Sequence, residues 1–190
     1  GAIEIKSGYG LKIESEIKIL KSIRRLKENT PITIKSTFLG AHAIPQEFKT
    51  SKEYLDLVIN LMIPKIIEKD LIDFIDIFCE EGYFNLEDTK RILIIAKKLN
   101  IQSKIHLNQF NSLGGVNLAT KYNALSVDHL EVMNDKDFKS LVNSETMPTL
   151  LPGCSFFLGI PYANAREFIK RGLPIAIASD YNPGSAPNGN

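Results

Sequence analysis

Three polar side chains end short β-rich runs in the second half of the chain. The run SKIH ends on His106, LSVDH ends on His129, and PIAIASD ends on Asp180. Neutral imidazole and carboxylate groups are suitable ligands for a borderline divalent cation. A carboxylate beside such a cation is also well placed to act as a general base. These residue types therefore point to metal-assisted hydrolytic chemistry.

The same residues are expected at the tips of parallel strands. In barrels of alternating strands and helices, the strand tips meet on one face and the loops beyond them vary. His42, the remaining histidine, also ends an apolar run, TFLGAH. A lone histidine after a strand is more often a structural residue, and Asp180 before NPG is also typical of an ordinary turn. Three histidines on strand tips together favour a site.

Composition limits the classes of function. The chain has 190 residues, 44% of them hydrophobic, and a net charge of +1 from 23 basic and 22 acidic residues. This balance indicates a globular domain and gives no reason to expect nucleic acid or a membrane surface as a partner. No apolar stretch approaches the roughly 20 residues that span a bilayer. The first residues lack the pattern of a signal peptide, and we expect a cytoplasmic protein.

The two cysteines, Cys79 and Cys154, show no metal-binding spacing. We interpret them as reduced, buried thiols. The acidic pair Glu80 and Glu81 is expected to be solvated or to cap backbone groups rather than to act in catalysis.

Short strands alternate with helical patterns along the chain, which is typical of a parallel α/β fold. The helix over residues 85–100 has Asn85 as its expected N-cap, and Pro64 is expected to kink or break the helix over residues 51–70. Another helix is expected over residues 14–29. Strands are predicted near residues 2–6, 32–39, 74–79, 102–107, 125–129, 146–150 and 174–179.

Seven strands and six helices are one unit short of a closed (β/α)8 barrel. A barrel without one strand has two unpaired edges, which natural folds avoid. We therefore expect residues 1–190 to be a partial catalytic barrel domain, a fragment of a longer enzyme truncated at both ends.

Several segments resemble the imidazolonepropionase family of the amidohydrolase superfamily. The similarity runs in order through almost all of the chain, and its most specific parts are SGYG, FLGAH and SDYNPGS. The other segments are EIKSGYGL, TFLGAHAIP, DIFCEEGYF, KIHLNQF and GGVNLATKYNALSVDHLE.

The resemblance implies a (β/α)8 TIM-like barrel of the metal-dependent hydrolase type and the hydrolysis of 4-imidazolone-5-propanoate to N-formimidoyl-L-glutamate. It implies one divalent metal ion, zinc or iron, bound by an HxH pair on the first barrel strand, His106 on the fifth and Asp180 on the eighth. The HxH pair does not occur in this chain, so the seven strands correspond to the second to eighth. An arginine that binds the substrate carboxylate in the family is missing with that first strand.

The metal would activate water, and Asp180 would take its proton and later pass it to the departing ring nitrogen. His129 is assigned to polarising the substrate carbonyl and stabilising the oxyanion. By the same resemblance, six residues are expected to contact substrate or product. They are Tyr9, His42, Gln109, Asn182, Gly184 and Ser185. Gln109 replaces the glutamate of some family members, so it is expected to recognise the ring and not to transfer protons.

Two alternatives stay open. The chain could belong to another amidohydrolase, such as a cytosine or guanine deaminase, in which the same ligands act on an exocyclic amine. It could also be a truncated module that is inactive on its own. We expect a small-molecule substrate and no nucleic-acid or membrane partner. A homodimer is among the expected assemblies.

Overall fold

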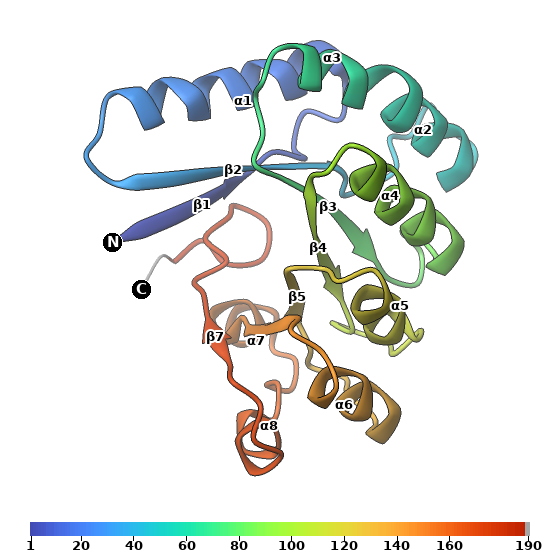
Figure 1. The fold of residues 1–190 in the computed structure, drawn as a ribbon, viewed down its shortest axis with the longest axis vertical. Coiled ribbons are helices and arrows are strands. Elements are labelled where there is room, and N and C mark those ends of the chain that lie inside the picture. Colours follow the sequence, from blue (N-terminus) through green and yellow to red (C-terminus); the bar gives the residue numbers. More distant parts are fainter. Residues whose placement is uncertain (189–190) are drawn as a thin grey trace. The chain divides into compact units, whose positions relative to one another are not determined.

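The computed structural model describes residues 1–188 and divides into two compact units. Unit 1 consists of Gly1–Phe78 and Gly82–Ser103, and unit 2 consists of Cys79–Glu81 and the chain from Lys104 onward. Each unit is built from parallel strands that alternate with helices (Figure 1).

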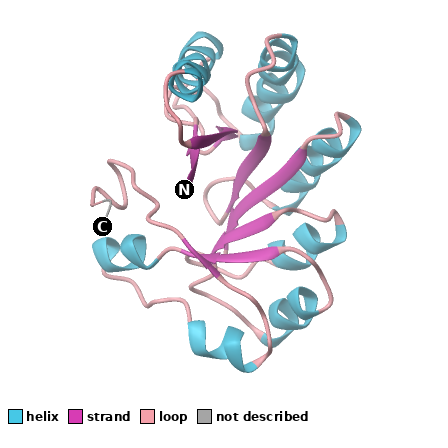
Figure 2. Ribbon diagram, turned by 60° about the vertical axis from the view of Figure 1, so that its left-hand side comes forward, coloured by secondary structure: helices cyan, strands magenta, loops and turns pink. Residues whose placement is uncertain are grey.

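Unit 1 contains three parallel strands, and Figure 2 shows that helices connect successive strands. The strands are β1 (Ala2–Lys6), β2 (Thr33–Ala41) and β3 (Phe74–Cys79), whose last residue falls in unit 2, and β2 lies between the other two. Lys6 lies beside Thr37, and Phe38 lies beside Ile75. The register shifts between Phe38 and Ala41, so the tip of β2 departs from regular pairing.

The helices of unit 1 follow the expected sequence signals. Helix α1 (Ile13–Glu28) has acidic residues in its first turn and basic residues in its last, which suits the helix dipole. Helix α4 (Leu86–Lys98) begins with a capping box, in which Asn85 and Asp88 each accept a hydrogen bond from the other's backbone N–H. The expected N-cap at Asn85 is therefore confirmed.

Pro64 interrupts the regular hydrogen bonding of its helix without ending it. The segment runs as α2 (Ser51–Leu57), a π-helical turn η1 (Val58–Met62) and α3 (Ile63–Glu68). Proline has no N–H to donate and its ring crowds the carbonyl one turn earlier. The wider π turn accommodates this residue, so the expected disturbance is a π-bulge.

Unit 2 contains four parallel strands in chain order. They are β4 (Gln102–Leu107), whose first two residues fall in unit 1, β5 (Ser126–His129), β6 (Met147–Leu150) and β7 (Ala176–Ile177). Their connections contain α5 (Gly115–Lys121), α6 (Asp135–Val142), α7 (Pro152–Leu158) and α8 (Ala165–Lys170).

Strand β7 is shorter than the run predicted over residues 174–179. Pro174 has no N–H for a sheet ladder. After Ile177 only one further bond extends the pairing, from the Ala178 N–H to the Leu150 carbonyl at 3.1 Å. Asp180 therefore follows a strand of two residues. All seven strands are otherwise found close to their predicted places, and the last of the six connections contains two short helices in place of one.

Large apolar side chains fill the interior of each unit. In unit 1 the fully buried ones include Phe38, Tyr54, Met62, Ile66, Ile75, Ile77, Phe84 and Ile92. In unit 2 the core includes Ile105, Leu107, Val116, Val127, Leu130, Leu141 and Phe168. Cys79 and Cys154 are both buried and form no disulfide, as expected. No helix within residues 1–188 is long and apolar enough to cross a membrane.

Candidate active site

The tips of β4 and β5 bring two predicted site residues together. His106 and His129 are both buried, and their ring centroids lie 5.3 Å apart in an edge-to-face arrangement. Asp128 pairs with His106 in the sheet register, and a carboxylate oxygen of Asp128 lies within 4.8 Å of a ring nitrogen of His106. This part of unit 2 therefore offers imidazole and carboxylate donors at metal-ligand spacing.

His129 ends β5 in a strained backbone conformation. Its φ angle is 88°, and that of Leu130 is 68°. Residues other than glycine rarely occupy this left-handed region, and each costs on the order of 1–3 kcal/mol. Such strain persists where surrounding packing determines the course of the chain, and it is concentrated at functional sites. Here it turns the chain sharply directly after the histidine.

Glu131 lies beside His129. Its Oε2 is 3.7 Å from the His129 Nδ1, and its side chain is 2% exposed. The other oxygen, Oε1, accepts a hydrogen bond of 2.7 Å from the Ser155 hydroxyl. A buried carboxylate on one side of an imidazole restricts the ring's orientation. Glu131 thus limits how His129 can turn.

Gln109 and Cys154 form a buried pair in unit 2. The Gln109 side-chain amide donates to the Cys154 sulfur at 3.3 Å. Burial, together with the charges of Asp180 and Glu131, raises the pKa of the Cys154 thiol to about 12, while a hydrogen bond with Ser185 acts in the opposite direction. The thiol therefore stays protonated at neutral pH and lies among three of the predicted site residues.

The residues after β7 form a turn that is closed by hydrogen bonds of its own. Asp180 is half-buried with a φ angle of 51°, and its carbonyl accepts a bond of 2.6 Å from the Asn182 amide. The Asn182 Oδ1 accepts from the Gly184 and Ser185 N–H groups at 2.9 and 2.8 Å. This is an Asx turn. It brings three of the expected substrate contacts together with Asp180, although Asn182 directs its Oδ1 into the turn.

Tyr9 and His42 come together in unit 1. Their ring centroids are 5.3 Å apart and nearly perpendicular. The His42 Nδ1 lies 3.0 Å from the Gly8 carbonyl oxygen, which can only accept a hydrogen bond. Nδ1 therefore carries a proton, and in neutral His42 the Nε2 is an acceptor. Tyr9 is 53% exposed, so this aromatic pair is partly open to solvent.

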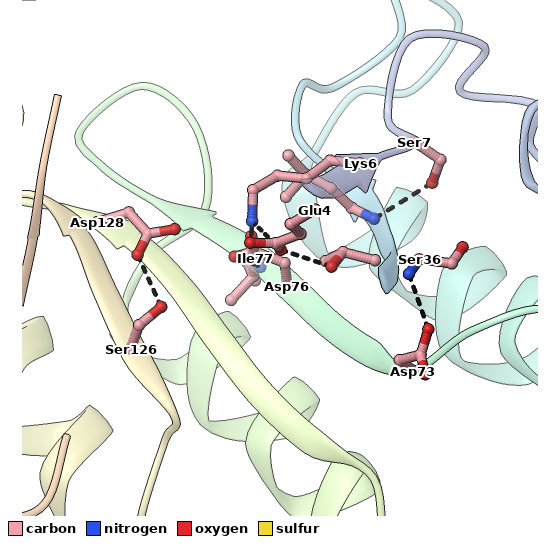
Figure 3. A network of polar contacts seen from close by, with 11 residues as sticks. Glu4, Lys6, Ser7, Ser36, Asp73, Asp76, Ile77, Ser126 and Asp128 are labelled. Atoms are coloured by element: carbon pink, nitrogen blue, oxygen red, sulfur yellow. Dashed lines mark hydrogen bonds and ion pairs between the residues drawn. The ribbon is translucent and has the colours of Figure 1, made fainter. Parts of the chain in front are cut away.

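A partly buried ionic network in unit 1 was not foreseen from the sequence. Lys6 lies 2.6 Å from a Glu4 oxygen and 2.9 Å from an Asp76 oxygen, and the Thr37 hydroxyl donates to Glu4 (Figure 3). The Asp76 side chain is fully buried. Burying a carboxylate requires a compensating charge or hydrogen bonds, which Lys6 supplies. The sequence signal was the alternation of Glu4 and Lys6 within an apolar strand.

Glu80 departs from the expected solvated state. It is 1% exposed, and its Oε2 accepts from the Phe110 and Asn111 N–H groups at 3.0 and 3.3 Å. Its Oε1 accepts from the Asn111 amide and the Glu81 N–H. The expected capping of backbone groups is thus present, but in a buried position. Glu80 fixes the loop that begins with Gln109.

The chain shares about half of its residues with imidazolonepropionases. It is 55% identical to those of Flavobacterium johnsoniae and Christiangramia forsetii over 100% of its length, and 48% identical to that of Alkaliphilus oremlandii over 99%. The resemblance to imidazolonepropionase is confirmed. The chain spans about half the length of these relatives, 46% of the first two and 45% of the third. No family model matches it.

Solved structures show the same fold at low sequence identity. An amidohydrolase from Burkholderia ambifaria with bound zinc matches with a TM-score of 0.70 at 14% identity, covering 93% of this chain and 52% of that one. Adenine deaminase from Arthrobacter aurescens matches with a TM-score of 0.67 at 13% identity, covering 93% and 56%. At these identities the likeness concerns the fold alone, and it agrees with the expected parallel α/β class.

Proposed function

We propose that the full-length protein containing this chain hydrolyses 4-imidazolone-5-propanoate to N-formimidoyl-L-glutamate. The observation that carries this proposal is 55% identity to imidazolonepropionases over all 190 residues. The deaminase alternative is supported only by likeness of fold. The seven parallel strands would be the second to eighth strands of a (β/α)8 barrel. A cytoplasmic location, a homodimer and the absence of nucleic-acid partners stay predictions.

One divalent metal, zinc or iron, would be held by His106 and Asp180, with the HxH pair supplied by sequence outside this chain. The imidazole and carboxylate of this pair are ligand types that suit such an ion. His106 is buried, and a carboxylate oxygen of Asp128 lies within 4.8 Å of one of its ring nitrogens. The charge of Asp180 raises the pKa of the Cys154 thiol. The same thiol accepts a hydrogen bond from Gln109, which lies three residues after His106 in the sequence. When bound, the metal supplies Lewis-acid activation of water near neutral pH.

The chain's own residues would carry the proton and hold the developing charge. Asp180 would accept a proton from the attacking water and deliver it to the ring nitrogen as the C–N bond breaks. His129 would donate a hydrogen bond to the carbonyl oxygen, where negative charge develops. Glu131, at 3.7 Å from the His129 Nδ1, would keep the ring turned so that its other nitrogen faces the substrate.

Recognition of the substrate would fall to polar groups without net charge. The residues that would contact it are those the resemblance implies: Tyr9, His42, Gln109, Asn182, Gly184 and Ser185. Such groups suit a planar polar ring, since they fix its orientation without a second charge to desolvate. Gln109 would recognise the ring only, because an amide does not titrate.

The proposal is tested by identifying the product. Full-length protein, loaded with zinc or iron, is incubated with 4-imidazolone-5-propanoate, and the products are resolved by mass spectrometry. We expect a gain of one water and formation of N-formimidoyl-L-glutamate. Parallel reactions contain cytosine or guanine. Ammonia release from either of these, with no turnover of the imidazolone, would contradict the proposal. The 190 residues alone are expected to be inactive, since two protein ligands rarely hold a divalent ion against water.

A further inference from the structure

Glu16 is a buried carboxylate that accepts hydrogen bonds from several backbone N–H groups of one loop. It lies in the first turn of α1 and has no measurable exposure. Its Oε2 accepts from the Gly8 N–H at 2.8 Å, and its Oε1 accepts from the Gly10 and Leu11 N–H groups at 2.8 and 2.9 Å. Three charge-assisted bonds thus hold the Ser7–Lys12 loop, which connects β1 to α1.

Other side chains of unit 1 hold the same loop at both ends. The Ser7 hydroxyl accepts from the Leu39 N–H at 3.3 Å, and the Ser7 N–H donates to the Thr37 carbonyl at 2.9 Å. The buried Tyr54 hydroxyl lies 3.2 Å from the Leu11 carbonyl oxygen and 2.9 Å from that of Gly40. The loop is therefore connected to β2 and α2 as well as to α1.

Close packing restricts the backbone conformation of the Ser7–Lys12 loop. A Cβ atom at Gly8, whose φ angle is 105°, would lie 2.4 Å from the Leu39 carbonyl oxygen. A Cβ atom at Gly10 would lie 2.4 Å from the Ser15 Cβ. Both separations are too short for real atoms, so this path requires glycine at both positions. Tyr9 lies between the two glycines, so the restricted backbone path fixes the position of its Cα atom.

We infer that Glu16 is a positioning residue for substrate recognition, acting through Tyr9 and His42. The anchored Gly8 turns its carbonyl oxygen to the His42 Nδ1 at 3.0 Å, while Tyr9 packs edge-on against the same ring. Fixing Gly8, Gly10 and Leu11 therefore fixes both side chains. The role in recognition rests on the proposed function, whereas the anchoring of the loop does not depend on it.

The negative charge of Glu16 is needed for this geometry. A carboxylate has only acceptor sites, so both oxygens can face N–H groups. In Glu16→Gln the amide NH2 replaces one oxygen and opposes at least one backbone N–H. The side chain keeps its length, which makes this variant a mild change. Glu14 lies on the exposed side of the same helix, so Glu14→Gln is a matched control for the loss of charge.

The test compares both variants in the full-length enzyme by hydrogen–deuterium exchange and by kinetics. Exchange in peptides covering residues 7–12 should rise in Glu16→Gln and stay unchanged in Glu14→Gln. For Glu16→Gln we expect KM for 4-imidazolone-5-propanoate to rise about tenfold while kcat and metal content change little, the pattern of a lost binding interaction. In a Tyr9→Phe background the added effect of Glu16→Gln should shrink, because coupled residues are not additive.

Unchanged exchange over residues 7–12 would overturn the anchoring. An equal rise in KM in the wild-type and Tyr9→Phe backgrounds, or a fall in kcat with loss of metal, would overturn the positioning role. Wild-type protein without turnover of the imidazolone would contradict the proposed function and with it the role in recognition, and the exchange result would still decide the anchoring.

Discussion

The loop after β1 and the segment after β7 both follow a strand tip, but they are held in different ways. The Ser7–Lys12 loop is fixed by side chains from α1 and α2, including Glu16 and Tyr54. The segment from Asp180 to Ala186 is held mainly by its own Asn182, through the Asx turn and a bridge to Ala186. The first loop takes its hydrogen bonds from three other elements, α1, α2 and β2. The second segment makes most of its hydrogen bonds within itself, and it meets the rest of unit 2 where Asp180 and Ser185 contact Cys154 and where Ala186 packs with Leu151 and Cys154.

This difference suits two different tasks. Contacts between distant residues open only when the surrounding structure opens, whereas a local turn opens at low cost. A preorganised loop is suited to bind a substrate in one orientation, as expected for Tyr9 and His42. The segment after β7 makes most of its hydrogen bonds within itself, so it can adjust more easily, as expected for Asp180 if it shares a metal and moves a proton. We therefore expect the first region to act in binding alone and the second to supply Asp180 to the chemistry besides its contacts with the substrate.

The largest effect is expected at the tips of β4 and β5. In the full-length enzyme His106→Ala should lose metal and activity together, because it removes an imidazole ligand. His129→Asn should keep the metal and lose rate, because its role is in the transition state. Metal analysis of both purified variants distinguishes the two. If His129→Asn emptied the site as fully as His106→Ala, His129 would be a ligand and the assignment of one metal would fail.

A stability comparison sharpens the contrast between the two regions. Gly10→Ala places a Cβ atom 2.4 Å from that of Ser15 and should lower the free energy of unfolding by about 1–3 kcal/mol. At Gly184 the nearest atom is the Asn182 Oδ1, at 3.4 Å, so Gly184→Ala should stay within about 0.5 kcal/mol. Urea unfolding of the full-length protein measures both. Equal losses would mean that the two segments are packed alike.

The smallest effect concerns Cys154 and appears only at high pH. Burial raises the pKa of its thiol from 9.0 to about 12. The neutral thiol is thus favoured in the folded state, and its contribution to stability is complete below pH 9 and lost as the pH rises toward 12. At pH 10 the expected loss is on the order of 1 kcal/mol. Unfolding free energies at pH 8 and pH 10 should differ by less in Cys154→Ala, and an unchanged difference would contradict the raised pKa.

Much of the fold follows from local signals. Asn85 and Asp88 specify the start of α4, and apolar runs locate the strands. Because parallel strand tips share one edge, the sequence also predicted that His106 and His129 lie close, as their rings do. The polar residues that support the site were harder to predict from the sequence. A buried carboxylate such as Glu16 or Glu80 has the same sequence signal as a solvated one, and its donors lie in another loop.

Contacts between residues far apart in the chain could not be predicted from the sequence for the same reason. Lys6 pairs with Asp76 across 70 positions, and Gln109 meets Cys154 across 45. Neither pair is marked by spacing or periodicity, since each depends on how strands align. The predicted length of strand β7 was too great. The prediction followed the hydrophobic residues over 174–179 and did not allow for the missing N–H of Pro174.

The division between binding and chemistry is tested most directly by steady-state kinetics of Asp180→Asn and Tyr9→Phe in the full-length enzyme at matched metal occupancy. Loss of general base catalysis should lower the kcat of Asp180→Asn by roughly 10² to 10⁴-fold. Tyr9→Phe should raise KM and leave kcat within a few-fold of wild type. An Asp180→Asn variant within a few-fold of wild type would show that Asp180 is a turn residue, and a collapse of kcat in Tyr9→Phe would contradict the assignment of the first region to binding.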